Sequence, residues 1–272
     1  MILIIGICQI EAKPKKGERN LFKDGFSVQS TAKTPLVNET KISAKIDGKW
    51  QSYDLVTFPD AFWNWNTSGR KLYIDIFREM LEKGPESTRK PELSGPHNGI
   101  VATYGSPRKD SRFAINNAVK GMGLLPKEEK LDELIALLRE TKAATLDIRL
   151  NVLDSLYSNA REIFAPDRLV SLELYSEQGF QTQTFINQMQ NPAVAIVWMD
   201  IPTFKMKGIA RLLHPDDTNL SDYEKKCVEY INLIHSYFHG EFPRDYIGVI
   251  YFATEIYDSS PGRKDAKGTR IK

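Results

Sequence analysis

The sequence has few cysteines, little net charge and no long apolar run, and each shortage excludes a class of protein. Its 272 residues include only 2 cysteines, too few for a disulfide-stapled domain or a cysteine-rich zinc module. Lys and Arg number 37 against 35 Asp and Glu, and the formal charge of +2 excludes polyanion binding driven by bulk charge. No apolar run approaches the ~18 residues of a membrane span. The composition, with 41% hydrophobic and 26% charged residues, is typical of a folded soluble protein.

The two ends of the chain set the expected location and domain limits. The apolar run at residues 2–8 has no basic segment before it and no small-residue cleavage site after it. We therefore interpret it as a buried strand rather than a signal peptide, and expect a cytoplasmic protein. Residues 262–272 are rich in Lys, Arg and Gly and predict a flexible basic tail. We expect a single α/β domain over residues 1–261.

Short apolar runs and amphipathic helical patterns succeed one another along the chain. Most runs lack clean alternation, which is typical of strands buried on both faces, and their alternation with helices predicts a largely parallel sheet in a layered α/β sandwich. Residues 42–46 do alternate, and the following Asp47-Gly48 predicts a surface hairpin. Strands are predicted over residues 2–10, 54–58, 99–104, 170–175, 194–199 and 246–257, and helices over residues 71–83, 127–141, 151–164 and 220–239. Ser221 and Glu224 form a predicted capping box at the last helix.

An acidic residue follows one of the predicted strands. Residues 55–60 read LVTFPD, so Asp60 falls at the carboxyl end of the strand. Ligands bind at that edge in parallel α/β folds, and a carboxylate there can act as a general base; the alternative is a cap for the next segment. The neighbouring Phe62 and Trp63 either line a pocket or pack in the core.

The order of these segments resembles the front half of the carbon–nitrogen hydrolase (nitrilase/amidase) family. The resemblance covers about the first 120 residues, with an extra hairpin at residues 33–52. It lies in Gln9, in Asn20-Leu21, in LVTFPDAF at residues 55–62, in GIVATYGS at residues 99–106 and in Asn116-Asn117-Ala118. It implies a layered nitrilase-like fold and hydrolysis of carbon–nitrogen bonds other than peptide bonds.

The resemblance also assigns roles to individual residues. The family works through a carboxylate base, a lysine and a nucleophilic cysteine. Asp60 takes the place of the family's base, and Asp200 matches the acid that follows its cysteine. Trp198 and Met199 stand where the cysteine should be, and no segment matches the lysine. Methionine forms no thiolate. The chain is therefore expected either to have replaced the usual chemistry or to be a pseudoenzyme that binds a small amide or nitrile through Phe62, Trp63, Trp198 and Met199.

The back half resembles a different family, the FMN-binding split-barrel proteins of the pyridoxamine-phosphate-oxidase type. Residues 187–213 contain NPAVAIVWMD and then KGIAR, followed by a helix and a last strand. This resemblance implies an α+β split barrel in the C-terminal half, FMN as cofactor and an oxidoreductase. The two resemblances predict different arrangements of the strands, which a structure can distinguish. The hydrolase places Asp60 and residues 199–200 in one pocket, whereas the split barrel places residues 194–199 in an antiparallel barrel.

Two further motifs carry chemistry of their own. Residues 105–111 read GSPRKDS and follow a strand; backbone N–H groups and Arg108 could hold a phosphate there, although the composition also suits a solvated turn. His235 and His239 share one helical face, and we interpret them as helix-end histidines rather than metal ligands.

The expected function is thus a divergent carbon–nitrogen hydrolase or its pseudoenzyme, without cofactor or metal. The alternatives are an FMN-dependent split-barrel oxidoreductase and a non-catalytic partner-binding protein. The expected partner is a small-molecule substrate, with neither nucleic acid nor membrane, and the surface aromatics permit a homodimer.

Overall fold

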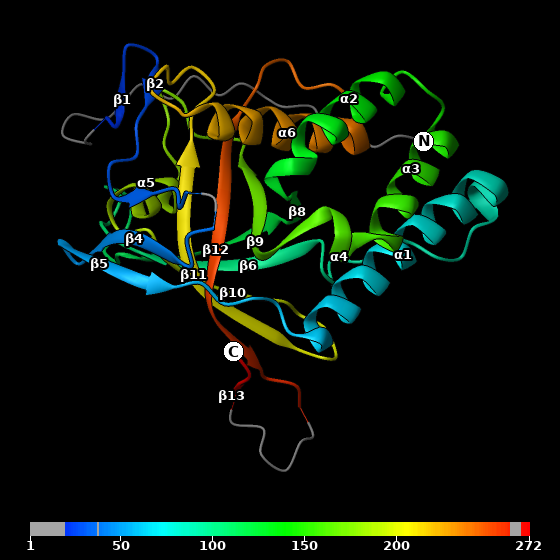
Figure 1. The fold of residues 1–272 in the computed structure, drawn as a ribbon, viewed down its shortest axis with the longest axis horizontal. Coiled ribbons are helices and arrows are strands. Elements are labelled where there is room, and N and C mark those ends of the chain that lie inside the picture. The colour runs from blue at the N-terminus through cyan, green and yellow to red at the C-terminus, as the bar shows by residue number, and fades with distance from the viewer. Residues whose placement is uncertain (1–19, 37, 262–267) are drawn as a thin grey trace.

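The computed structural model describes residues 20–36, 38–261 and 268–272. The predicted first strand at residues 2–10, with Gln9, lies outside these residues. The structure combines three antiparallel sheets with helices that cover them (Figure 1). The strands are β1 (Phe22–Lys23), β2 (Phe26–Ser27), β3 (Ala32–Lys33), β4 (Lys41–Ile46), β5 (Lys49–Asp54), β6 (Asn98–Tyr104), β7 (Ile115–Gly121), β8 (Gly123–Pro126), β9 (Phe164–Glu173), β10 (Ala193–Val197), β11 (Phe204–Leu213), β12 (Ile247–Asp258) and β13 (Thr269–Arg270).

The helices are of unequal length and pack in two pairs. Helix α2 packs on α6, and α1 packs on α3 (Figure 1). The α-helices are α1 (Asp60–Lys83), α2 (Leu131–Thr141), α3 (Leu146–Ser158), α4 (Ala160–Ile163), α5 (Gln183–Gln190) and α6 (Asp222–His239), with 3-10 turns η1 (Gly84–Glu86) and η2 (Glu128–Lys130). None of these helices has both the length and the apolar character needed to cross a bilayer. The capping box at α6 is confirmed, since Ser221 and Glu224 exchange both hydrogen bonds.

The main sheet is antiparallel throughout, which contradicts the predicted parallel sheet. Its strands follow the order β7-β6-β10-β11-β12-β9-β8. The predicted layered nitrilase-like sandwich is therefore wrong. The misreading has a physical cause: strands such as β12 are buried on both faces, and a run buried on both faces shows no alternation whether its neighbours are parallel or antiparallel.

The main sheet curls round on itself. Strand β7 pairs with β6, and β8 pairs with β9 at the opposite end of the strand order. Only Met122 separates β7 from β8, so one continuous run of chain joins the two ends of the sheet and forms a barrel. The β7 part of this run does not pair with β9. The ion pair between Lys120 and Glu173 links β7 to β9 there. We call this region the split side of the barrel.

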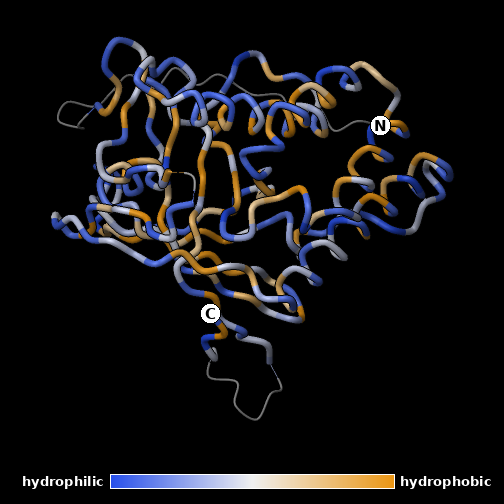
Figure 2. Tube along the Cα trace, in the orientation of Figure 1, coloured by the Kyte–Doolittle hydropathy of each residue, from blue (hydrophilic) through white to orange (hydrophobic). Residues whose placement is uncertain are grey.

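The core fills the inside of the barrel and the space beneath the helices. Figure 2 shows hydrophobic residues concentrated along the central strands and hydrophilic residues along the outer loops. The N-terminal segment is attached to the barrel by a buried side chain. The Gln29 amide donates to the carbonyl oxygens of Gln188 and Ala210 and accepts from Leu212 N–H at 2.9 Å. This buried side chain ties the small β3-β4-β5 sheet to the barrel, because an amide left unpaired there would be costly.

Of two predictions about local structure, the hairpin is present and the strand after it is not. The hairpin at residues 42–48 is confirmed, and Asp47 and Gly48 both adopt positive φ, as a tight two-residue turn requires. The predicted strand at residues 54–58 is absent, since β5 ends at Asp54. Val56 and Phe58 instead donate single backbone hydrogen bonds to Ala253 and Pro166, so this segment crosses the barrel without joining a ladder. Of the predicted tail, residues 262–267 lie outside the described residues, and β13 pairs with β12.

Candidate functional site

A polar groove opens on the split side, between the start of β7 and the start of α5. Its volume is about 360 Å³, within the ~300–1,000 Å³ that small-molecule sites commonly occupy. One wall comes from the loop after β6 and from β7, and the other comes from the first turn of α5. The groove is lined by Arg108, Asp110, Ser111, Ile115, Asn116, Ala118, Thr182, Gln183 and Thr184.

Helix α5 begins at the groove because its sequence carries a start signal. Thr182 is the N-cap, and its Oγ1 accepts a hydrogen bond from Phe185 N–H at 3.1 Å. Phe185, Ile186 and Met189 are buried and fix the helix against the sheet. Pro192 follows the end of the helix and prevents its continuation. The first turn is therefore held in one orientation.

The first turn of α5 presents unused donors to the groove. A helix leaves its first N–H groups without intrahelical acceptors, and these groups carry the positive end of the helix dipole. Within the described part of the chain, the N–H groups of Gln183 and Thr184 have no acceptor. Thr184 Oγ1 accepts from the Asn116 amide at 2.8 Å, which leaves the hydroxyl proton to be donated. This donor set suits an anion, and phosphate above all.

A buried acid locks this turn in place. Glu173, at the end of β9, pairs with Lys120 at 2.7 Å, and the Glu173 side chain is completely buried. Its second oxygen accepts from Ser176 at 3.1 Å and from Thr182 at 3.2 Å. The carboxylate therefore connects β7, β9 and the N-cap of α5. A helix start that is held by three elements keeps its N–H groups aimed at the groove.

The loop after β6 supplies a cation from the opposite wall. Arg108 forms two parallel hydrogen bonds with Asp110, at 2.9 and 2.6 Å, and lies over the ring of Phe180. Asp110 is largely exposed, with 58% of its side chain accessible, so this pair is weak and an incoming anion can compete for the guanidinium. The backbone N–H of Arg108 donates to Gln183 Oε1, which ties the loop to α5. The predicted phosphate loop therefore faces the anion-binding turn.

The two acids assigned by the hydrolase resemblance lie apart from this groove. Asp60 is the first residue of α1, with 83% of its side chain exposed, and it pairs with Arg161 at 2.5 Å. Asp200 follows β10 and accepts from Trp65 Nε1 at 2.8 Å. No contact within the described residues brings the two acids together. Their catalytic role stays a prediction that nothing in this geometry supports.

The predicted substrate-binding aromatics are mostly core residues. Phe62 and Trp198 are fully buried and lie 5.5 Å apart between ring centroids in an edge-on contact. Trp63 is 4% exposed and packs on Phe58, whereas Met199 is 67% exposed. The cluster attaches α1 to the sheet, which is the core-packing alternative for these residues. Their role in binding a substrate also stays a prediction.

The remaining candidate nucleophile and metal ligands carry no site of their own. Burial raises the pKa of the Cys227 thiol to about 12, so the thiolate is absent at neutral pH. Cys8 lies outside the described residues. His235 Nδ1 is 2.8 Å from the carbonyl oxygen of Ile231, one turn earlier in α6. In the part of the chain that the structure describes, no group of three or more His, Cys, Asp and Glu residues could hold a metal ion.

Helix α5, which forms one wall of the groove, was not among the helices predicted from the sequence. The signal was present: Thr182 precedes apolar residues at helical spacing, and Pro192 follows. The helix is only 8 residues long, and the polar run before it reads as a loop. Asn116 and Arg108 were noticed, but nothing local indicates that they face Thr184.

Comparison with known proteins found several similar solved structures. No protein-family model and no curated protein matches the sequence. One structure is a protein of Clostridium acetobutylicum related to general stress protein 26 of B. subtilis, of the pyridoxinephosphate oxidase family; it is 10% identical with a TM-score of 0.29, covering 74% of this chain and 95% of that chain. Another is a NimC/NimA family protein of the same organism; it is 14% identical with a TM-score of 0.30, covering 78% of this chain and 96% of that chain.

The arrangement of the strands corrects the first resemblance, to the carbon–nitrogen hydrolases. The geometry contradicts that resemblance directly, because Asp60 faces solvent and β10 lies between β6 and β11 with antiparallel pairing on both sides. This is the arrangement expected of the alternative, in which residues 194–199 lie in an antiparallel barrel. The hydrolase interpretation is therefore wrong.

Proposed function

We propose that this chain is an FMN-binding split-barrel protein with oxidoreductase activity, and that its groove holds the phosphate end of the flavin. One observation carries the proposal: Arg108 and the unused donors of Gln183 and Thr184 converge from opposite walls of one groove. The order of β10, β11, α6 and β12 also follows the pattern on which the resemblance of the back half rests.

The residues present fit a flavin phosphate. Two backbone N–H groups at a helix start, one hydroxyl and one guanidinium are a donor set that phosphate prefers. Ile115 and Ala118 give the groove an apolar side, next to the polar end formed by Thr182 and Thr184. A ligand with a phosphate, a polyhydroxylated chain and an aromatic ring matches this gradient better than a compact ion does.

In this proposal the protein's own residues bind and orient the flavin. FMN, when bound, supplies hydride and single-electron transfer, which protein side chains do not provide. Lys120 and Glu173 keep the α5 turn rigid, so the phosphate is held without reorganisation of the helix. Arg108 closes the opposite wall and neutralises negative charge. The electron donor or acceptor that meets the flavin is not specified by these residues.

The first test is flavin binding by the purified protein. Absorbance in the flavin bands, or binding of added FMN, supports the proposal, and riboflavin should bind at least about tenfold more weakly because it lacks the phosphate. A protein that binds neither compound contradicts the proposal and leaves the partner-binding interpretation. Equal binding of FMN and riboflavin would keep a flavin but remove the phosphate from the groove.

A single substitution locates the phosphate. Thr184→Val keeps the shape of the side chain and removes the hydroxyl donor, so FMN affinity should fall roughly 5- to 10-fold while riboflavin affinity stays unchanged. Thr67→Val is the matched control, because Thr67 lies on α1 and its hydroxyl donates to the Trp63 carbonyl. Fluorescence titration of FMN gives both values. An unchanged FMN affinity in Thr184→Val would place the phosphate elsewhere.

A further inference from the structure

A second cavity lies under the helices, away from the groove. It sits between α1, α3 and α6 and reaches the strand run at Met122. Its volume of about 70 Å³ holds roughly five water-sized groups, at about 10–15 Å³ for each. Ile74, Leu153, Ile234 and Phe238 give it apolar walls. His239, exposed at the end of α6, marks where the cavity reaches the surface.

One buried cation faces this cavity with part of its hydrogen-bonding capacity unused. Arg70 is 5% exposed and lies on α1. Its Nε donates to Asn66 at 2.8 Å, and its Nη2 donates to the carbonyl oxygens of Met122 and Pro96 at 2.7 and 3.4 Å. Its Nη1 has no acceptor among the described residues. The guanidinium carbon also lies 5.5 Å from the ring centroid of Tyr157, so every partner is neutral, and no carboxylate of the described residues pairs with Arg70.

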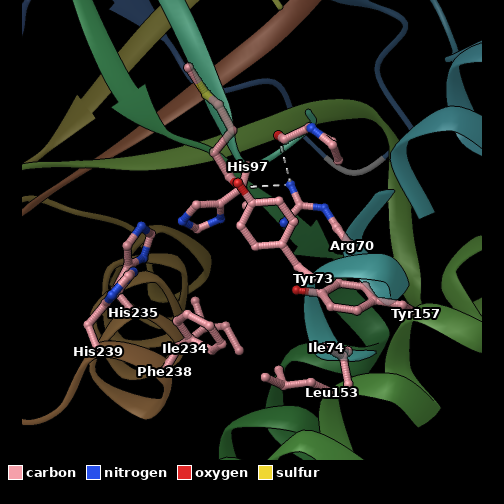
Figure 3. Close-up of a pocket in the computed structure, with 13 residues that line it drawn as sticks. Arg70, Tyr73, Ile74, His97, Leu153, Tyr157, Ile234, His235, Phe238 and His239 are labelled. Carbon is pink, nitrogen blue, oxygen red and sulfur yellow. Dashed lines mark hydrogen bonds between the residues drawn. The ribbon is translucent and has the colours of Figure 1, made fainter. Parts of the chain in front are cut away.

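The rest of the cavity wall carries no compensating charge. Figure 3 shows His97, His235 and His239 grouped on one side, with Arg70 and Tyr157 on the other. Burial and the nearby Arg70 lower the pKa of His97 to about 3, and burial lowers that of His235 to about 4. These imidazoles are therefore neutral at pH 7. None of the described residues that line the cavity is acidic, so the guanidinium is its one full charge.

A buried, uncompensated cation beside an open space is costly unless an anion enters. The space is too small for a nucleotide, and a bare phosphate carries up to two negative charges where the lining offers the single positive charge of Arg70. A carboxylate suits the two N–H groups that remain on Nη1, because hydrogen bonds between a guanidinium and a carboxylate are charge-assisted and strong. A short aliphatic tail would then fill the volume between Leu153 and Phe238.

We propose that this cavity binds a small monocarboxylate with a short apolar tail, with its carboxylate on Nη1 of Arg70 and its tail between α3 and α6. The Arg70 guanidinium is already fixed by Asn66, Met122 and Pro96, so binding requires little ordering of the side chain. His97 and His235, being neutral, supply an additional donor or acceptor beside the carboxylate. This site is separate from the flavin groove and does not depend on it.

The experiment uses butyrate as probe and butyramide, its neutral isostere, as control. Calorimetric titration should show saturable binding of butyrate at one site and about 10- to 100-fold weaker binding of butyramide. Arg70→Gln should weaken butyrate binding by a similar factor. Arg78→Gln changes an arginine of the same helix that pairs with Asp154 of α3 and does not line the cavity, so it should leave butyrate binding unchanged. Equal affinity for the two compounds, no binding of either, or full binding by Arg70→Gln would overturn the proposal.

A second measurement needs no change at Arg70. Butyrate should shift the imidazole NMR signals of His97 and His235 in the unaltered protein, with the same saturation curve as the calorimetric signal. Leu153→Trp fills the apolar end of the cavity and should abolish both effects while Arg70 remains in place. Saturable butyrate binding that leaves the two histidine signals in place, or that survives Leu153→Trp, would put the carboxylate elsewhere and contradict the assignment.

Discussion

The two sides of the barrel are held together by different means. On one side all ten residues of β11 pair with β12 in a continuous ladder, interrupted by one irregularity after Lys207. On the split side β7 and β9 have no ladder, and a buried ion pair between Lys120 and Glu173 connects them. The split side opens into the groove. Where two strands do not pair through their backbones, side chains must hold the strands together and also determine which ligand binds between them.

The largest expected effect comes from breaking the split side. Lys120→Met leaves the Glu173 carboxylate buried without its cation, which should lower the free energy of unfolding by about 3–5 kcal/mol. Urea denaturation measures this change. The double variant Lys120→Met/Glu173→Leu removes both charges and should recover most of the loss. A cost below about 1 kcal/mol for the single variant would show that the ion pair does not hold the split side together.

A smaller effect is expected from crowding the ladder side. A Cβ at Gly208 would overlap the carbonyl oxygen of Phe252 on β12, and backbone on both strands cannot move aside cheaply. Gly208→Ala should therefore cost about 1–3 kcal/mol in urea denaturation. Gly121→Ala is the matched control on β7, because the nearest atom to its Cβ would be His97 Nε2 at an ordinary 3.8 Å. Equal costs at the two glycines would contradict the comparison.

The effect that is smallest at neutral pH is a pH dependence that comes from the cavity under the helices. Burial lowers the pKa of His97 to about 3 in the folded protein, against about 6.5 in the unfolded chain. The unfolded state therefore takes up the proton first, and stability falls as pH drops below 6.5. His97→Gln should flatten this dependence by up to about 1.4 kcal/mol per pH unit.

Thermal unfolding between pH 7.5 and pH 4.5 measures the histidine contribution. The unaltered protein and His97→Gln should differ least in stability at pH 7.5, where His97 is neutral in both the folded and the unfolded state. His235 also has a lowered pKa and should leave part of the slope in place in the variant. An unchanged slope in His97→Gln would mean that His97 takes up its proton in the folded state.

The sequence predicted local structure well where the signal was local. The hairpin at Asp47-Gly48 and the capping box at Ser221 and Glu224 follow from turn and cap chemistry within a few residues. The direction of the strands was not predictable in this way, since burial on both faces hides it. Asp60 illustrates the difference: its position after an apolar run suggested a strand end, and the structure makes it the exposed start of a helix.

Only one wall of the groove was predictable from the sequence. Arg108 and Asn116 stood out as polar residues after a strand, while Thr184 lay in a segment for which no helix or strand was predicted. Their meeting depends on the barrel closing, which brings together residues about 70 positions apart, as in the hydrogen bond from Asn116 to Thr184. The cavity at Arg70 depends on three helices and had no signature along the chain.

The continuous run from β7 to β8 leaves the protein little tolerance for a change of chain length there. Its first part pairs with β6 and presents Asn116 and Ala118 to the groove, and its last part pairs with β9 beyond Met122. Strand side chains alternate between faces, so inserting or deleting one residue between Ala118 and Met122 would reverse one half relative to the other. Either the groove wall or the cavity wall would then turn outward. Substitutions in this run are compatible with the fold, whereas a single-residue insertion or deletion would cost the protein one of its two candidate sites.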